Sequence, residues 1–275
     1  MEPFATLHQP IGVFDAGIGS YAAVRRLQER LPNQDLIYLA DRASFPYGGK
    51  DRQALLDATA QAVQCLQGLG ASAILMASNA PSVTVLEDLR RTASVPLFGV
   101  VPPVAEALAL SKSGQIGVLG VRSMVESAEL GAYITAASRG RGQAFSFNAS
   151  ALVELVESGA FLTDPARTGA EVGAFVRAIL ATHPEIDVFT LSSTHLPWLG
   201  DYFQRLFPGK AFVDPVRASV EALAPLSTTG TGRVVCAVTE NPAHTVADFR
   251  WMLGAMGIEL EVVVIGEREV STLRI

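Results

Sequence analysis

Short apolar runs alternate along this chain with amphipathic helical patterns, and this alternation constrains the fold more than any other feature. Residues 11–15 (IGVFD) form an apolar run that ends in a carboxylate, and a turn at 17–20 leads into a helical pattern. The unit recurs, with strands expected at 35–40 and 73–77 and helices at 52–69 and 82–91. Uninterrupted apolar strands that alternate with helices are typical of parallel sheets covered on both faces. The sequence therefore predicts an α/β protein.

A second series of strands, which resembles the first, is expected in the middle of the chain. It begins after Pro96, with strands at 97–101, 116–120 and 188–192. Residues 116–120 (IGVLG) resemble 11–15, and 188–194 (VFTLSST) resemble 73–79 (AILMASN). Strand patterns return at 233–238 and 260–266, and we expect them to complete the first sheet.

This internal repeat predicts two pseudo-symmetric α/β domains with mostly parallel sheets and an interdomain cleft. The length of 275 residues also favours two domains over one. We expect residues 1–97 plus 213–275 to form the first domain and residues 98–212 the second. Strands of two such halves would direct their carboxyl ends into a shared cleft.

Charge and cysteine content argue against several classes of partner and site. The net charge is −6, and no block of Lys or Arg occurs, which argues against binding to nucleic acid or an anionic membrane. No apolar stretch reaches the roughly 20 residues of a membrane span, and the first residues lack a secretory pattern, so a cytoplasmic location is expected. Cys65 and Cys236 lack metal-ligand spacing and are expected to be buried thiols. No metal is expected, because the sequence has no cluster of metal-ligating residues, and no dinucleotide cofactor is expected, because Gly17-Ile18-Gly19 lacks the third glycine of a dinucleotide motif.

Two short polar motifs follow buried strands and mark a candidate ligand site. Ser78-Asn79 comes directly after the third strand of the first series, and Ser193-Thr194-His195 follows the last strand of the second series. Ligands of open α/β sheets bind at the carboxyl ends of strands. The sequence therefore predicts a two-sided site for a small molecule, with one motif on each wall.

Six segments, in the same order, resemble the motifs of glutamate racemases. Residues 11–20 (IGVFDAGIGS) resemble the family's opening I-G-V-F-D-S-G-x-G-G, and 77–80 (ASNA) fall where the family has A-C-N-T. Residues 192–197 (SSTHLP) are similar to its G-C-T-H-Y-P. The other similar segments are LPN at 31–33 with the following IY, PYG at 46–48, and VELVE at 153–157. The resemblance covers nearly the whole chain.

The resemblance implies a cofactor-independent inversion at the α-carbon of glutamate, which supplies D-glutamate for peptidoglycan. In this family two cysteines act from opposite faces, so that a thiolate takes the α-proton while a thiol donates one. Cysteine suits this task because its pKa of about 8.5 lies close to neutrality. The family's habit also implies a homodimer.

Serines stand at the positions of both family cysteines, Ser78 and Ser193. The pKa of a serine hydroxyl is several units higher, and each unit costs about 1.4 kcal/mol in forming the anion. Without an adjacent base, both are expected to be poor carbon bases. Ala16, Ala80 and Met124 also replace family hydroxyls, the last in its G-T-x-x-T motif. These further changes favour natural divergence over a deliberate exchange of the cysteines, and they predict altered ligand contacts.

The resemblance implies roles for residues on the first wall of the site. Asp15 would support the first base and bind the substrate amine, and Asn79 would bind a carboxylate oxygen. Tyr47 and Gly48 would form a loop over the ligand. A structural turn or helix cap stays open for Asp15 and Asn79, as does an ordinary turn for Tyr47-Gly48.

On the second wall, His195 would serve Ser193 and Glu157 would be its acidic partner, while Thr194 would bind a carboxylate oxygen. A core histidine, a solvent-facing helical glutamate and a capping threonine are the alternatives. The expected catalytic residues are Asp15, Ser78, Glu157, Ser193 and His195. The expected substrate-binding residues are Asp15, Ala16, Tyr47, Gly48, Ser78, Asn79, Ala80, Ser193, Thr194 and His195.

Three classes of function follow. The first is an amino-acid racemase of weak or altered activity, acting on a small dicarboxylic amino acid. The second is a binding or regulatory protein that keeps the acid-binding turns but has lost the bases. In the third, Ser193 or Ser78 is a nucleophile or proton relay activated by His195 and a carboxylate, since residues i and i+2 can share a strand face. The expected ligand is a small amino acid or carboxylic acid, although the third class would act on a different substrate.

Overall fold

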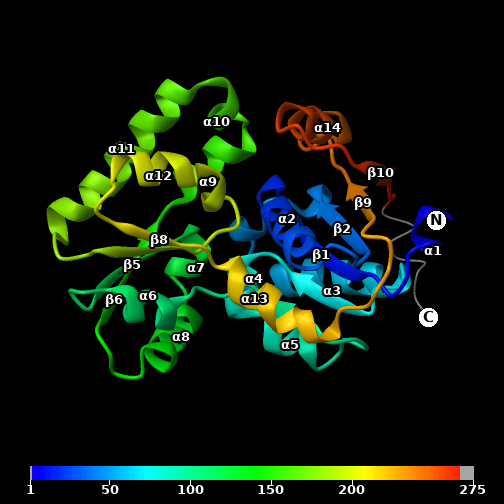
Figure 1. Cartoon of the computed structure of the whole chain (residues 1–275), viewed down its shortest axis with the longest axis horizontal. Helices are drawn as coiled ribbons and strands as arrows, with labels where there is room; N and C mark the ends of the chain where they lie inside the picture. The colour runs from blue at the N-terminus through cyan, green and yellow to red at the C-terminus, as the bar shows by residue number, and fades with distance from the viewer. Residues whose placement is uncertain (1, 267–275) are drawn as a thin grey trace.

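The computed structural model describes residues 2–266, which form two parallel sheets with helices packed against them (Figure 1). The first sheet has six strands in the order β10-β9-β2-β1-β3-β4, and the second has four in the order β6-β5-β7-β8. The strands are β1 Ile11–Asp15, β2 Leu36–Asp41, β3 Ala73–Met76, β4 Leu97–Gly99, β5 Gln115–Gly120, β6 Gln143–Asn148, β7 Val188–Leu191, β8 Ala211–Val213, β9 Val234–Thr239 and β10 Glu261–Val264.

Helices connect most of these strands. The α-helices are α1 Glu2–Ala5, α2 Tyr21–Arg30, α3 Arg52–Gly68, α4 Asn79–Thr84, α5 Leu86–Arg90, α6 Val104–Leu110, α7 Arg122–Val125, α8 Ala128–Ser138, α9 Ser150–Glu157, α10 Ala160–Thr163, α11 Pro165–Thr182, α12 Gly200–Leu206, α13 Val216–Leu223 and α14 Val246–Ala255. Short 3-10 helices are η1 Ile18–Ser20, η2 Arg42–Ser44, η3 Tyr47–Gly49, η4 Leu196–Leu199 and η5 Ala224–Leu226. None of the helices in the described part of the chain has the length and apolar character that a membrane-spanning segment needs.

The two sheets share one strand order, which confirms the predicted pseudo-symmetric α/β fold. The segment β2-β1-β3-β4 of the first sheet corresponds to β6-β5-β7-β8 of the second, so β1 matches β5 and β3 matches β7. These are the same strand pairs that the internal sequence repeat joins. The C-terminal strands β9 and β10 extend the first sheet beyond β2, as the strand patterns of the tail predict.

One strand assignment from the sequence is wrong. The strand at 97–101 was expected to open the second series, but β4 pairs in parallel with β3 and forms the edge of the first sheet. Apolar patterns show that a strand is buried without showing which sheet it joins. The expected domain boundaries after residues 97 and 212 each fall inside a strand, β4 and β8, and the domain ranges themselves stay a prediction.

Two strands of the second sheet gave too weak a pattern to be predicted. β6 (QAFSFN) lies at the edge of the sheet and has only half-buried and exposed positions, so it lacks the uninterrupted apolar run of a central strand. β8 has only three residues, which is too short for a period to be visible.

Successive residues of the central strands pack on opposite faces of the first sheet. Val13 and Tyr38 lie in the cluster that α2, α13 and α14 cover, whereas Phe14 and Leu39 lie in the cluster that α3 and α5 cover. Every residue of β1 is buried, including Asp15 at its carboxyl end. The double cover explains why the strands read as uninterrupted apolar runs.

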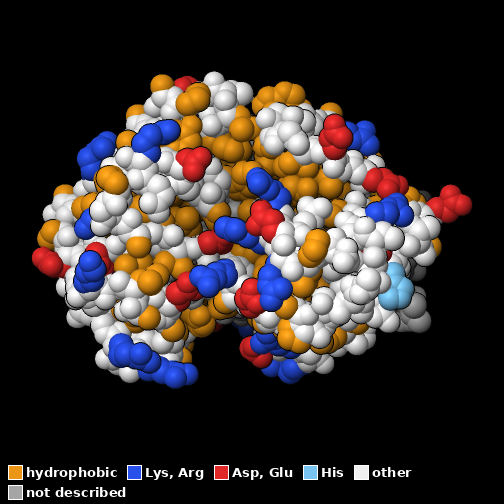
Figure 2. Space-filling model, in the orientation of Figure 1, with side chains coloured by type: hydrophobic (Ala, Val, Ile, Leu, Met, Phe, Trp, Pro, Cys, Tyr) orange, Lys and Arg blue, Asp and Glu red, His pale blue; other side chains and the backbone are white. Residues whose placement is uncertain are grey.

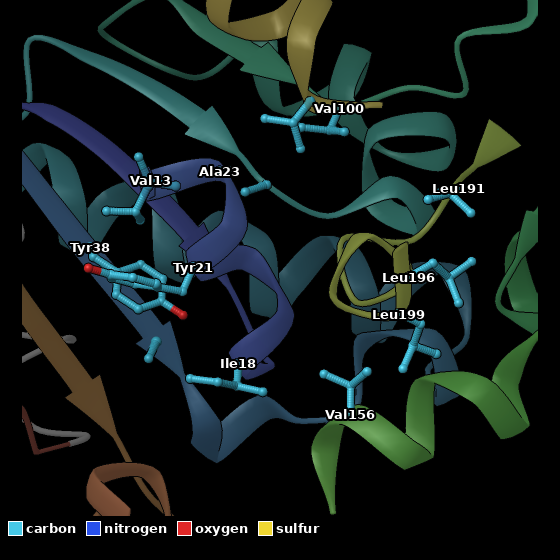
Figure 3. Close-up of a cluster of buried hydrophobic side chains, with 14 of the residues drawn as sticks. Val13, Ile18, Tyr21, Ala23, Tyr38, Val100, Val156, Leu191, Leu196 and Leu199 are labelled. Carbon is cyan, nitrogen blue, oxygen red and sulfur yellow. The ribbon is translucent and has the colours of Figure 1, made fainter. Parts of the chain in front are cut away.

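The largest buried cluster continues from one half of the molecule into the other. Ile18 of η1 and Val13 of β1 belong to the same cluster as Val156 of α9 and Leu196 and Leu199 of η4 (Figure 3). This packing brings the turn after β1 against the turn after β7. In the space-filling view, the outline is notched between the halves, and acidic and basic side chains are interspersed on the face shown (Figure 2).

Candidate active site

A cavity of about 350 Å³ lies where the carboxyl ends of strands from both sheets meet. Its lining residues are Asp15, Ala16, Gly17, Phe45, Pro46, Tyr47, Gly48, Gly49, Ser78, Asn79, Ala80, Val121, Arg122, Ser150, Val153, Glu154, Ser192, Ser193, Thr194 and His195. All of the residues predicted to bind substrate therefore line this one cavity. Glu157 does not line it and instead contacts His195 from behind.

Asp15 ends β1 as a buried carboxyl with two hydrogen-bond donors. Oδ1 accepts the Ala16 N–H at 2.8 Å, and Oδ2 accepts the Thr194 hydroxyl at 3.2 Å, which joins the two halves of the molecule. Burial raises the pKa of Asp15 to about 6, although the charge of His195 and hydrogen bonds from Ala16 and Ser78 oppose the rise. A carboxyl with this pKa can gain or lose a proton near neutral pH.

Glu157 ends α9 and receives donors on both carboxylate oxygens. Oε1 accepts the Ile18 N–H at 2.7 Å and lies 2.6 Å from His195 Nε2, while Oε2 accepts Arg42 Nη1 at 2.7 Å. Burial opposes ionisation, but the hydrogen bonds and charges of His195 and Arg42 outweigh it and lower the pKa of Glu157 to about 2. A solvent-facing helical position is therefore wrong for Glu157, whose side chain is 5% exposed.

His195 lies between Glu157 and Ser193. Its Nδ1 atom is 3.4 Å from Ser193 Oγ, and its Nε2 atom faces Glu157. Burial alone would lower the pKa of His195, but the hydrogen bond and charge of Glu157, together with Asp15, raise it above the ordinary value. Both ring nitrogens thus have partners, and the imidazole can pass a proton between its ring and the serine hydroxyl.

The contact between Ser193 and His195 arises in a different way than the sequence predicted. β7 ends at Leu191, so Ser193 and His195 lie in the turn before η4 and do not share a strand face. The Leu196 N–H donates to the Ser193 carbonyl at 3.0 Å, which tightens this turn and brings the two side chains together.

Ser78 ends the corresponding turn after β3, and Asn79 begins α4. Ser78 is 8% exposed, and its carbonyl accepts the Ser82 hydroxyl. Asn79 Nδ2 donates to the Val100 carbonyl at 2.9 Å, which leaves Oδ1 buried and without a protein partner in the described structure. The unpartnered atom is an acceptor, so this oxygen suits an ammonium or hydroxyl donor of a ligand. A contact from Asn79 to a carboxylate would need its N–H groups.

The loop at Tyr47-Gly48 closes one side of the cavity and is anchored outside it. The Tyr47 hydroxyl donates to Asp41 Oδ2 at 2.8 Å, and the Thr239 hydroxyl donates to Asp41 Oδ1 at 2.9 Å. Thr239 ends β9, so the C-terminal part of the chain helps to hold a loop of the site. The side chain of Tyr47 therefore holds this loop in place through a contact outside the turn.

Gly17 and Gly19 allow the His195–Glu157 pair to approach the turn after β1. A Cβ atom at Gly17 would lie 2.2 Å from Glu157 Oε1, and one at Gly19 would lie 2.5 Å from His195 Cγ. Real contacts are never this short, so the two glycines leave room for the pair. The sequence predicted a turn here, but not that its glycines make space for a site side chain.

Several residues at the cavity or behind it were missed by sequence reasoning. The missed lining residues are Gly17, Phe45, Pro46, Gly49, Val121, Arg122, Ser150, Val153, Glu154 and Ser192. Seven of these ten stand in the compared motifs; Val121, for example, is the second residue of the segment compared with G-T-x-x-T. Ser150, Val153, Glu154 and Glu157 share one face of α9 because they are spaced three or four residues apart. Nothing in the sequence signalled Arg42.

Within residues 2–266, His, Cys, Asp and Glu form no group of three or more that could hold a metal ion. Cys65 and Cys236 are both buried and free, and neither lines the cavity. Burial raises the pKa of the Cys65 thiol to about 12 and that of Cys236 further. Neither thiol therefore belongs to the site.

Comparison with known proteins identifies the family of this chain. Residues 17–223 match the Asp/Glu/Hydantoin racemase family, which is more than half of the chain. The chain belongs to this family. A glutamate racemase of Deinococcus radiodurans is 34% identical over 247 residues, which cover 86% of this chain and 83% of that protein.

Solved structures in the same racemase family show the same fold. Glutamate racemase from Thermus thermophilus in complex with β-chloro-D-alanine superimposes with a TM-score of 0.73 and 28% identity, over 94% of this chain and 98% of that one. Escherichia coli glutamate racemase, in complex with L-glutamate and an activator, has a TM-score of 0.81 at 23% identity, over 94% and 98%. Membership in the family supports a racemase function for this chain.

Proposed function

We propose that this racemase-family protein binds a small amino acid, or a related carboxylic acid, in the cavity and exchanges its α-proton without a cofactor. The proposal rests on one observation: each of two strand ends presents a serine hydroxyl beside a titratable group, Ser78 beside Asp15 and Ser193 beside His195. Inversion at carbon needs a proton acceptor on one face and a donor on the other. Paired hydroxyls and bases can supply both.

On the first wall, Ser78 would act as a relay to Asp15. As the substrate α-proton moves to Ser78 Oγ, the hydroxyl proton moves to the Asp15 carboxylate, so no free alkoxide forms. On the second wall, Ser193 would donate its proton to the carbanion and receive one from protonated His195. The reverse transfers serve the other enantiomer, and protons and charge balance in both directions.

This arrangement predicts slow exchange. The pKa of Asp15, raised to about 6 by burial, makes it a weaker base than a thiol with a pKa of about 8.5. The difference corresponds to roughly 3 kcal/mol of lost driving force for proton abstraction. The serines, together with the alanines at 16 and 80, therefore support an activity that is weak or altered in its substrate, and divergence at both base positions is part of the proposal.

Loss of the α-proton signal in D₂O, followed by NMR, tests the proposal. We expect slow exchange with at least one enantiomer of glutamate or aspartate, faster exchange in the double variant S78C/S193C, and none in S78A/S193A. S158A, which changes an exposed serine, is the matched control. The absence of exchange from both wild type and S78C/S193C would contradict the racemase proposal. Thermal stabilisation by these acids without exchange would favour a binding or regulatory role.

A second candidate function is supported by the contacts Ser193–His195–Glu157. The distances of 3.4 Å and 2.6 Å link a hydroxyl, an imidazole and a carboxylate in the order of a nucleophile, its base and an orienting acid. In this reaction Ser193 Oγ would attack a carbonyl carbon while His195 takes the hydroxyl proton. A fluorophosphonate serine reagent that labels wild type and spares S193A supports it, and an unlabelled wild type rules it out.

The homodimer, the cytoplasmic location and the division into residues 1–97 plus 213–275 and 98–212 remain part of this proposal. Family resemblance supports the dimer, and the shared strand order supports the two domains. Light scattering on the purified chain measures the first, and a monomer at all concentrations would contradict it.

A further inference from the structure

Arg42 is a buried charge that the proposed reaction does not use. It begins η2, directly after β2 of the first sheet, and its side chain is 3% exposed. Its Nη1 group reaches Glu157 Oε2 on α9 at 2.7 Å, and its guanidinium lies 5.4 Å from the centre of the Phe45 ring. Arg42 does not line the cavity, so it cannot touch a ligand there. Buried charges in proteins are paired, and the partner of Arg42 is Glu157. Any effect of Arg42 on the site therefore acts through Glu157.

The hydrogen bonds of Glu157 show what Arg42 does to that carboxylate. Arg42 occupies Oε2, and the Ile18 N–H and His195 share Oε1. Each carboxylate oxygen thereby has its own partners, and these contacts fix the orientation of the carboxylate plane. Without Arg42, Oε2 would be a buried acceptor with no donor, and the carboxylate could rotate away from His195.

The charges around His195 show what Arg42 does to the imidazole. Glu157 on α9 and Asp15 at the end of β1 both favour the imidazolium, whereas burial opposes it most strongly and Arg42 on η2 is the charged group that opposes it. Without Arg42, the two carboxylates would hold the proton more tightly on the ring. A histidine that never releases its proton cannot accept one from Ser193.

We propose that Arg42 is a positioning residue, which neutralises Glu157 and holds its carboxylate so that His195 can both donate a proton to Ser193 and accept one from it. The effect on turnover rests on the proposed function, whereas the effect on the protonation of His195 does not. Arg42 lies in one half of the molecule and its partner in the other, so the pair also fixes the second wall of the cavity relative to the first.

NMR of protein with ¹⁵N-labelled histidine tests this inference without any substrate. The chain has four histidines, and H195Q assigns the resonance of interest while His8, His183 and His244 serve as internal references. In R42M the titration of His195 is expected to move to higher pH, because the opposing charge is gone. R42K keeps the charge and is expected to restore the wild-type titration. R167M, which breaks an exposed Arg–Glu pair on α11, is the matched control.

R42Q covers the case in which R42M does not fold, and it separates charge from hydrogen bonding. Glutamine can still donate to Glu157 but carries no charge, so His195 is again expected to titrate at higher pH. In R42M, rotation of the freed carboxylate away from His195 would oppose the effect of the lost charge, so R42Q is the deciding variant. A wild-type titration in R42Q, with unchanged reference histidines, would overturn the inference. If no protein exchanges α-protons but the titration of His195 moves, the proposed function fails and the role of Arg42 stands. If α-protons exchange but the titration of His195 does not move, the role of Arg42 fails and the proposed function stands.

Discussion

Asp15→Asn is expected to change how the stability of the protein depends on pH. The carboxyl is buried, and its folded-state pKa of about 6 lies above the ordinary value of 3.8. A raised pKa means that the folded state resists ionisation of this group. The resulting cost to stability is absent below about pH 3.8, grows as the pH rises to about 6, and stays constant above that pH.

The magnitude follows from the size of the pKa difference. A difference of roughly two units, at about 1.4 kcal/mol per unit, makes ionised Asp15 cost about 3 kcal/mol. Asparagine removes this cost but can accept only one of the hydrogen bonds from Ala16 and Thr194, which loses about 1 kcal/mol at every pH. The Asp15→Asn variant should therefore be slightly less stable than wild type in acid and more stable at alkaline pH.

Urea unfolding of both proteins across the pH range measures the difference. The free energy of unfolding of the variant minus that of wild type should rise by about 3 kcal/mol between about pH 3.5 and pH 8, mostly between about 4 and 6. Asp201→Asn, which changes an exposed carboxyl on α12, is the matched control. A difference for Asp15→Asn that rises no more with pH than the difference for Asp201→Asn would refute the reasoning about the burial of Asp15.

Two further substitutions test the geometry behind the cavity. Gly19→Ala places a Cβ 2.5 Å from His195 Cγ and should lower the free energy of unfolding, measured in urea, by about 1–3 kcal/mol. Gly200→Ala is the control and should cost nothing, because the space around Gly200 is open. Equal effects of the two substitutions would contradict the close approach of His195 to Gly19. Glu157→Gln leaves the Arg42 charge buried without an opposite charge and should cost about 3–5 kcal/mol. Glu171→Gln, in an exposed pair, should cost less than about 1 kcal/mol. A small loss at Glu157 would mean that Arg42 is not buried as described.

Much of the fold could be predicted because the strands are buried on both faces. β1, β2, β3, β7 and β9 appear as apolar runs, and α3 was predicted within one residue of its bounds. The order of β4 in the sheet could not be predicted, because its pairing with β3 depends on packing rather than on its own residues. The half-exposed β6 was not predicted, because its own residues form too weak a pattern.

The sequence by itself predicted half of the residues that line the cavity. The polar motifs at 78–79 and 193–195 follow strands, and parallel strands direct their carboxyl ends to the same edge of a sheet. Residues 16, 47–48 and 80 were predicted from the resemblance to the racemase motifs. Only the tertiary structure decided which groups contact one another in the second wall. Glu157 contacts groups 115 and 139 positions away in the chain, at Arg42 and Ile18. Such contacts depend on how the two halves pack, and no local pattern of residues records that packing.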